Sequence, residues 1–334
     1  MNETEPAARA AILAAGLACG AGLGLARCHR AYAARAAGPK RETSAIGPDG
    51  APPILGLALP FDRPRQAHAR LAALLAAALV DIGPNPISPR AGPVPVALLL
   101  PAWAPTSLRD VLKAQFPPGF SDLRFVQGGS ANSLGLLSQA ARAIAEGRVA
   151  GALVCAVDSL ANAERMDALM LNGAMYCQTN PYGIIPGEAA AAMLLVPEGT
   201  AGAIGRLRDV RTAVEPPGPL RGRGLAACLR ALAPAWDSGP PAIRLLSDLS
   251  GPRKRAETFG VGIAAAGPEI GGLARLPETP ALAIGDPGEA FGLVLACLTL
   301  GRAPPAYPDG DAALVVTALR PAAALVDRLV GSTR

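Results

Sequence analysis

Short apolar runs alternate with amphipathic, alanine-rich stretches along this chain. Such alternation is typical of α/β layers and argues against an all-helical or an all-β domain. The pattern predicts buried strands at 11–13, 94–100, 152–157, 191–196, 242–246 and 312–316. It predicts helices at 65–81, 105–115, 130–147, 221–233, 254–266 and 287–301.

The predicted elements suggest an internal duplication. The helix at 130–147 with the strand at 152–157 has the same layout as the helix at 287–301 with the strand at 312–316. Fixed layouts that recur along a chain indicate repeated units, although here the residues themselves differ. Because a Pro/Gly-rich stretch covers 215–219, we predict one half over 1–214 and another over 215–334, packed together as one unit.

Composition limits the classes of function. With 51% hydrophobic and 17% charged residues among 334, the chain can bury a large core. The net charge is +5 and only 4% of residues are aromatic, so a nucleic-acid surface is not expected. The six cysteines form no CxxC pair, and we find no metal-ligand cluster, Walker loop or complete dinucleotide loop. We therefore predict reduced core thiols, no metal and no cofactor.

The apolar stretch at 10–26 raises the question of a signal peptide or a membrane helix. It consists of Ala and Gly more than Leu, and two Glu against one Arg precede it, whereas a signal peptide has a positive start. We interpret it as a buried strand followed by a Gly-rich turn, and we predict a cytoplasmic protein without a membrane partner.

The segment 128–198 resembles the nucleophile region of the β-ketoacyl-ACP synthases (3-oxoacyl-ACP synthases), a family of the thiolase superfamily. AIAEG at 143–147 is similar to the end of the family's nucleophile helix, and GIIPGEAA at 183–190 to its GF-x-x-GE-G-A-A phrase. More weakly, 285–292 resembles the family's GHT-x-GAAG, and 249–251 its His-Gly-Thr phrase. The resemblance implies a thiolase-like fold of duplicated α/β/α/β/α layered halves with mixed central sheets.

The family condenses acyl chains with a Cys nucleophile and two histidines that stabilise a developing enolate oxygen. By the resemblance, the nucleophile position falls on Ser130, the first histidine on Ser250, with Asp248 two residues earlier, and the second on Asp286. We expect three more residues near this site, which are Cys177, Gly187 and Glu188.

The chain lacks the residues of that reaction. Its only histidines, His29 and His68, lie in the first quarter, whereas the family's pair belongs to the second half. The family's lysine corresponds to Ala281, and its Gly-Phe-Gly-Gly gate to the residues 307–310. We therefore predict that this chain does not condense acyl chains.

Each candidate also has a structural interpretation. Ser130 suits the N-cap of the helix at 130–147, and Asp286 suits an N-cap followed by proline at the first helical position. Glu188 is expected to hold backbone donors in a turn. Cys155 is expected in the core, which leaves Cys177 as the thiol of interest.

Three hypotheses remain open. In the first, the chain is a catalytically degenerate ketosynthase-like protein, a pseudoenzyme that serves as non-catalytic partner or scaffold of a fatty-acid or polyketide-type synthase or of another assembly, in the manner of chain-length factors. It would form a homodimer, or a heterodimer with a ketosynthase-like protein, and could meet an acyl carrier protein. In the second, Ser130 is the nucleophile of an acyltransferase or thioesterase, with Asp248 or Asp286 as base. In the third, Cys177 or Cys155 serves a true condensing enzyme.

Overall fold

The computed structural model describes residues 9–61, 67–85, 87, 94–128, 133–218, 221–235, 243–267, 277–305, 312–318 and 320–329. Within these residues, ten strands form one mixed sheet, and two short strands form a separate pair. The strands are β1 (Ala10–Cys19), β2 (Gly22–Leu23), β3 (Lys40–Arg41), β4 (Ile54–Leu55), β5 (Val94–Leu100), β6 (Phe120–Gln127), β7 (Ala152–Ser159), β8 (Glu188–Val196), β9 (Gly205–Thr212), β10 (Ile243–Ser247), β11 (Ala312–Thr317) and β12 (Ala322–Arg328). The helices are α1 (Leu25–Ala33), α2 (Ala67–Val80), α3 (Leu108–Lys113), α4 (Ser133–Ala145), α5 (Ala163–Leu171), α6 (Arg223–Leu232), α7 (Arg253–Ala266), α8 (Ala281–Ile284) and α9 (Phe291–Thr299).

The strand order repeats between the two sides of the sheet. The order is β10-β11-β12-β9-β1-β8-β7-β5-β6, with β2 paired to β1. On one side, β5 and β7 are parallel, and β7, β8 and β1 follow antiparallel. On the other side, β10 and β11 are parallel, and β11, β12 and β9 follow antiparallel. The duplicated α/β layout is therefore present, while the boundary between 214 and 215 stays a prediction.

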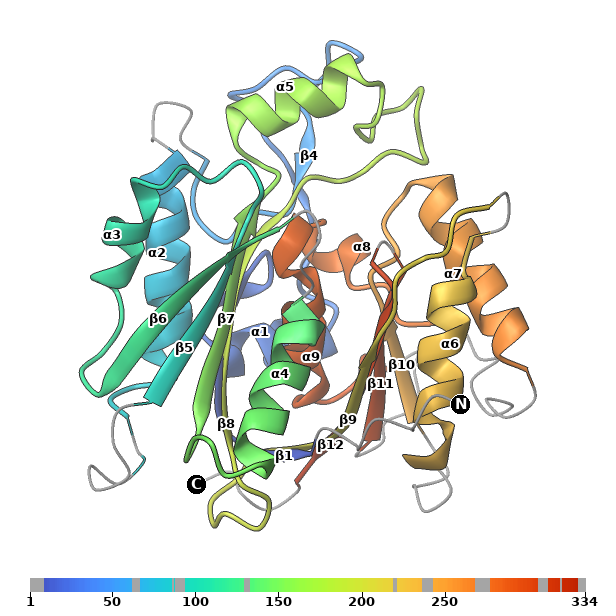
Figure 1. The fold of residues 1–334 in the computed structure, drawn as a ribbon. Coiled ribbons are helices and arrows are strands. Elements are labelled where there is room, and N and C mark those ends of the chain that lie inside the picture. Colours follow the sequence, from blue (N-terminus) through green and yellow to red (C-terminus); the bar gives the residue numbers. More distant parts are fainter. Residues whose placement is uncertain are drawn as a thin grey trace.

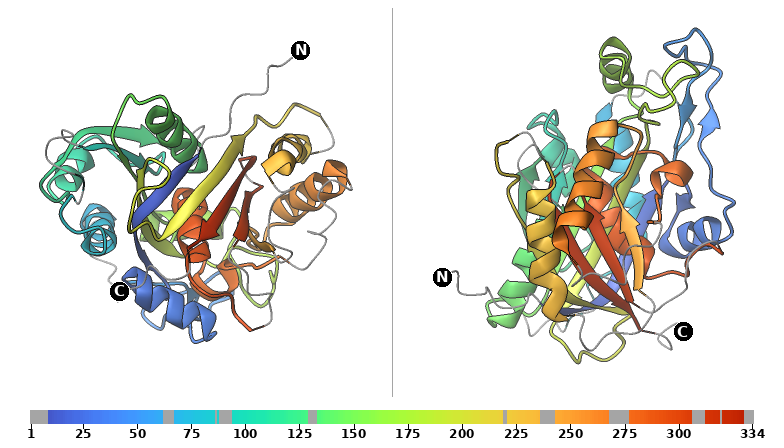
Figure 2. Two further views of the ribbon diagram at one scale, coloured as in Figure 1. Left: turned by 90° about the horizontal axis from the view of Figure 1, so that it is seen from below. Right: turned by 90° about the vertical axis from the view of Figure 1, so that its right-hand side faces the viewer.

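Helices separate and cover the two sides of the sheet, which gives the layers α/β/α/β/α (Figure 1). Helices α4 and α9 lie between the two sides and contact each other, α2 and α3 cover one outer face, and α6 and α7 cover the other. Figure 2 shows from below how the sheet curves around the central helices. This arrangement is the one that the resemblance implied.

Burial explains which helix occupies which layer. All nine residues of α9 are buried, and a helix that is apolar on every side is stable only in an interior layer. In α6, by contrast, the buried Leu225, Cys228, Leu229 and Leu232 follow the spacing of one helix face, so its opposite face can remain in solvent. Strands β7 and β8 are buried along their whole length, as expected for strands covered by helices on both faces.

The predicted elements were found with shifted ends. The predicted strand at 11–13 is the first part of the longer β1, and residues 10–26 form β1, β2 and the start of α1. No helix in the described part of the chain has both the length and the apolar character to cross a membrane. The predicted helix at 287–301 begins as an α-helix only at Phe291, because a 3-10 turn, Gly288–Ala290, precedes it.

Candidate functional site

Main-chain hydrogen bonds place Asp286 beside the start of β8. The Asp286 N–H donates to the carbonyl oxygen of Ile185 at 2.8 Å, and the Gly187 N–H donates to the carbonyl oxygen of Asp286 at 2.9 Å. A side chain at Gly187 would put its Cβ 2.8 Å from the backbone of Gly285, so the two segments can approach only because glycine stands there. Gly187 therefore belongs to the frame of the site.

The structure brings Ser250 and Asp286 into direct contact, although 36 positions separate them in the sequence. The Ser250 hydroxyl donates to Oδ2 of Asp286 at 2.6 Å. Nη1 of Arg255 donates to the same carboxylate oxygen at 2.8 Å and to Oγ of Ser250 at 2.5 Å. The other carboxylate oxygen of Asp286 accepts the N–H of Gly288 at 2.9 Å. The three side chains form one closed network, which we call the Asp286 network.

Arg255 is the residue of this network that the sequence did not single out. Burial lowers the pKa of its guanidinium, but the carboxylates of Asp286 and Asp248 outweigh burial and raise that pKa above its usual value. Arg255 therefore stays charged, and it neutralises Asp286, of which only 1% is exposed. A charged pair at this depth satisfies the general rule that buried charges are paired.

Asp248 ties neighbouring strands together. Its Oδ1 accepts the N–H of Ala318 at 2.8 Å, and its own N–H donates to the carbonyl oxygen of Val316 at 3.1 Å. Its carbonyl oxygen accepts a bond from Arg255 at 2.7 Å. These contacts hold the segment after β10 against the end of β11 and so position Ser250.

After Arg255, a second residue that the sequence did not single out is the acidic Asp158, which lies at the end of β7. Its Oδ1 accepts the N–H of Ser159 at 2.7 Å, and its Oδ2 accepts the N–H of Glu289 at 2.9 Å. Burial raises the pKa of Asp158 to about 7; the charge of Asp286 acts in the same direction, and that of Arg165 opposes it. This carboxyl group therefore titrates near neutral pH.

Glu188 has the structural role that the sequence suggested. Its Oε1 accepts the N–H groups of Ala58 and Leu59, both at 2.9 Å, and Nη2 of Arg70 donates to the same oxygen at 2.7 Å. Nε of Arg70 donates to Oε2, and the Glu188 side chain has no exposed surface. The pair anchors the chain between β4 and α2 to the sheet.

The other sequence candidates lie apart from this network or outside the described residues. Cys155 is enclosed in β7, where burial raises the pKa of its thiol, so it lacks the thiolate that a nucleophile needs. Cys177 is 8% exposed and its sulfur lies 3.2 Å from Oγ1 of Thr179. Nε2 of His29, on α1, lies 2.9 Å from the carbonyl oxygen of Cys297, on α9. Ser130 and the residues 307–310 fall outside the described part of the chain.

The N-cap interpretation of Asp286 was right only in part. Asp286 does accept a backbone N–H close to a helix start, but Pro287 is not the first residue of that helix. The carboxylate also holds Ser250 and Arg255, contacts that a cap alone does not require.

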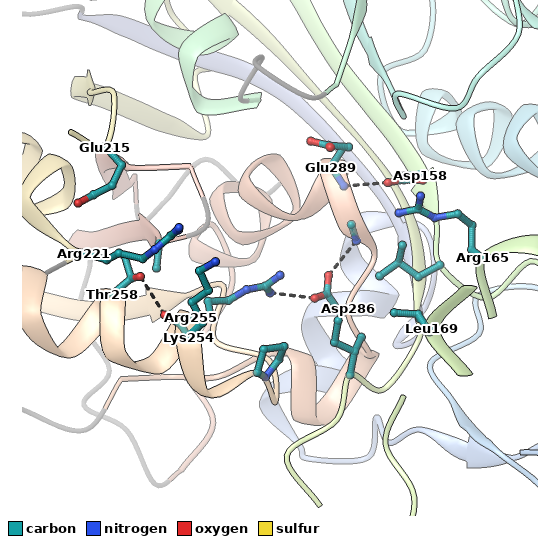
Figure 3. Close-up of a pocket in the computed structure, with 15 residues that line it drawn as sticks. Asp158, Arg165, Leu169, Glu215, Arg221, Lys254, Arg255, Thr258, Asp286 and Glu289 are labelled. Carbon is teal, nitrogen blue, oxygen red and sulfur yellow. Dashed lines mark hydrogen bonds and ion pairs between the residues drawn. The ribbon is translucent and has the colours of Figure 1, made fainter. Parts of the chain in front are cut away.

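A pocket of about 370 Å³ opens beside Asp286 (Figure 3). Its polar lining contains four carboxylates and four cations, which are Asp158, Glu215, Asp286, Glu289, Arg165, Arg221, Lys254 and Arg255. Neither Cys155 nor Cys177 belongs to the described lining. Over the described chain, no group of three or more His, Cys, Asp or Glu side chains is arranged to hold a metal ion.

Comparison with solved structures identifies the fold. An ishigamide ketosynthase/chain length factor structure superimposes with a TM-score of 0.68 at 17% identity, covering 96% of this chain and 99% of that chain. The chain has the thiolase-like fold of the ketosynthases. This ketosynthase-fold protein is also similar to a type II PKS acyl-carrier protein complex with its ketosynthase (TM-score 0.70, 16% identity, 98% of this chain and 100% of that chain). A ketosynthase in complex with its chain length factor from Xenorhabdus doucetiae matches with a TM-score of 0.66 at 15% identity, over 96% of this chain and 98% of that chain.

The comparisons by sequence give nothing further. No family model matches the ketosynthase-fold protein, and no curated protein does. Sequence identities of 15–17% to the structures named above fix the fold and leave its chemistry to be argued from the site.

Proposed function

We propose that this ketosynthase-fold protein does not condense acyl chains and acts as a binding subunit of an active ketosynthase. The Asp286 network carries the proposal. By the sequence resemblance, Ser250 and Asp286 stand where a condensing enzyme has its two histidines, and both chain histidines, His29 and His68, lie elsewhere, on α1 and α2.

The chemistry of the network opposes condensation. A condensing site must offer hydrogen-bond donors to an enolate oxygen as negative charge develops on it. Asp286 brings a negative charge instead, and the hydroxyl of Ser250 is already donated to that carboxylate. Nη1 of Arg255, the cationic donor of this network, is held by Asp286, by Ser250 and by the carbonyl oxygen of Asp248. The hydroxyl of Ser250 and Nη1 of Arg255 therefore already have acceptors within the protein and are not available to an enolate oxygen.

A partner surface is available at β6. Among the described strands, β6 lies at the end of the sheet, and none pairs with its outer edge. Between β6 and α4 lie two hollows of about 430 and 440 Å³ that share Arg124, Leu136 and Gln139. An unpaired strand edge beside a groove is suited to pairing with another sheet. Two of the similar structures are named as a ketosynthase with a chain length factor, which supports a second ketosynthase-fold protein as the occupant.

Reconstitution with an active ketosynthase from the same host tests the proposal. We expect light scattering to give the summed mass of the two chains, and we expect acyl condensation by the partner to require this subunit. Ala143→Trp places a bulky ring in the groove beside α4 and should weaken the complex by at least about ten-fold. Ala168→Trp, on the exposed face of α5, is the matched control.

Each outcome of that experiment is informative. A heterodimer that Ala143→Trp disrupts and Ala168→Trp does not supports the proposal. A stable homodimer that shows no affinity for the active enzyme, or a chain that stays monomeric in its presence, contradicts it. Condensation by this chain alone also contradicts it.

Intact mass spectrometry after incubation with acyl-CoA and acyl-ACP donors tests the nucleophile hypothesis separately. A binding subunit gains no acyl adduct. An adduct present in the wild type and absent from Ser130→Ala would assign the protein to the acyltransferases or thioesterases instead.

A further inference from the structure

The carboxylates that line the pocket already have hydrogen-bond donors. Both oxygens of Asp158 and both oxygens of Asp286 accept bonds within the protein. Glu215 accepts three N–H groups at the start of α6, at 2.8, 3.1 and 3.1 Å. Both oxygens of Glu289 accept bonds from Arg320. The pocket therefore presents no vacant carboxylate oxygen to an incoming cation.

Three of the four cations that line the pocket differ in this respect. Arg255 is held by Asp286, but no described residue accepts a hydrogen bond from the side chain of Arg165, Arg221 or Lys254. Figure 3 shows Arg165 reaching into the pocket from the α5 side and the other two from the side of α6 and α7. The charge of Arg165 reaches Asp158, whose pKa it lowers against the effect of burial. With Arg320, which pairs with Glu289 from outside the lining, there are five cations to four carboxylates, and no described residue uses the side-chain donors of three of these cations.

Apolar groups complete the lining. The wall also contains five apolar residues, which are Leu160, Leu169, Ile184, Pro252 and Ala318. A volume of about 370 Å³ is within the range of small-molecule sites, which are mostly apolar with a few polar groups that fix orientation. The occupant that fits has an apolar body and an anionic head.

We propose that this pocket binds a small amphipathic oxyanion, a carboxylate or phosphate on a short apolar chain, through Arg165, Arg221 and Lys254. Guanidinium groups match both kinds of oxyanion with paired donors, and the lysine adds a point charge. The assignment does not depend on the proposed subunit role, because binding is measured on this chain alone, without a partner.

Isothermal titration calorimetry with four probes of equal chain length tests the site. Hexanoate and hexyl phosphate carry the anionic head, hexanol is neutral and hexylammonium is a cation. We expect one or both anions to bind, more weakly as ionic strength rises, whereas hexanol binds at least about ten-fold less tightly and hexylammonium does not bind. The tighter of the two anions identifies the head group.

Variants locate the site on the chain. Arg165→Met and Lys254→Met should each weaken anion binding by about ten-fold and leave hexanol unaffected. Arg253→Met is the matched control: Arg253 is in the same helical turn as Lys254, is paired with Glu257, and is absent from the pocket lining. Equal binding of hexanol and the anions, no binding of either anion, or equal losses in all three variants would overturn the proposal.

Discussion

Arg70–Glu188 and Arg255–Asp286 are both buried arginine–carboxylate pairs, yet one is enclosed and the other borders the pocket. The carboxylate of Glu188 also accepts two backbone N–H groups, and Arg70 also donates to the carbonyl oxygens of Pro60 and Leu59. Around Asp286, the hydroxyl of Ser250 and the N–H of Gly288 supply the other donors. The pocket beside it is lined by both carboxylates and cations (Figure 3).

The difference teaches how the same pair can serve two purposes. The enclosed pair fixes a loop to the sheet and has no access to a ligand. The bordering pair neutralises one negative charge in the wall of a pocket, where three other cations keep hydrogen-bond donors that no described residue uses. Substitutions in each pair, measured for their effect on unfolding free energy, can therefore distinguish the enclosed pair from the bordering pair.

The largest effect is expected for the enclosed pair. Arg70→Met leaves the Glu188 carboxylate buried without its cation, which should lower the free energy of unfolding by about 3–5 kcal/mol. Guanidinium unfolding of the variant measures this loss. Arg253→Met is the control, because its pair with Glu257 is 88% and 55% exposed and should contribute less than about 1 kcal/mol. Equal losses in the two variants would refute the comparison.

A smaller loss is expected beside the pocket. Arg255→Met removes the cation of Asp286, but water in the pocket can solvate the carboxylate, so we expect a loss of about 1–3 kcal/mol. Adding Asp286→Asn in the same protein should recover part of it, because the uncompensated charge is then gone. A double-mutant cycle measured by chemical unfolding gives the coupling, and a coupling of zero would show that the pair is not energetically linked.

The last effect is a dependence of stability on pH at Asp158, which is small within any one pH unit. Its pKa is raised from the ordinary 3.8 to about 7 in the folded protein, so between these values the folded state keeps a proton that the unfolded state has released. Stability from this group is therefore present at low pH and is lost as pH rises from about 4 to about 7, by up to about 1.4 kcal/mol per pH unit.

Asp158→Asn should remove this contribution and flatten the decline of the unfolding free energy between about pH 4 and pH 7. Unfolding curves measured across that interval give the slope. The exposed Asp167 on α5 offers the control substitution Asp167→Asn. A slope that is the same in both variants would mean that Asp158 does not titrate in this range.

Much of the fold was accessible from the hydrophobic pattern, and β9 shows how a strand can escape it. Strands β7 and β8 and helix α9 are apolar throughout, so their sequences reveal their buried positions. Strand β9 was not predicted because it alternates arginines with apolar residues, and Arg206 and Arg208 are paired with Asp327 on the neighbouring β12. Pairing across strands hides such an element from any measure of local hydrophobicity.

The site was predicted in part for a related reason. Resemblance placed Ser250 and Asp286 in one site, and the structure puts them in contact. Arg255 was missed because it stands in a run of three cations, Arg253, Lys254 and Arg255, a pattern typical of a solvated surface. Its partner Asp286 lies 31 positions away. A signal was present, since cations in the first turn of α7 oppose the helix dipole by about 0.3–1 kcal/mol each. Such a cluster indicates that an anion lies nearby.

The backbone ladder that joins Ile185, Gly187 and Asp286 also bears on how this site can change over generations. Its bonds involve only main-chain atoms and so do not need the side chain of residue 286, whose contacts are with Ser250, Arg255 and the N–H of Gly288. Replacement there alters the charge offered to a ligand while the frame keeps its shape. One scaffold can in this way exchange a reactive group for an inert one, or the reverse, in few substitutions.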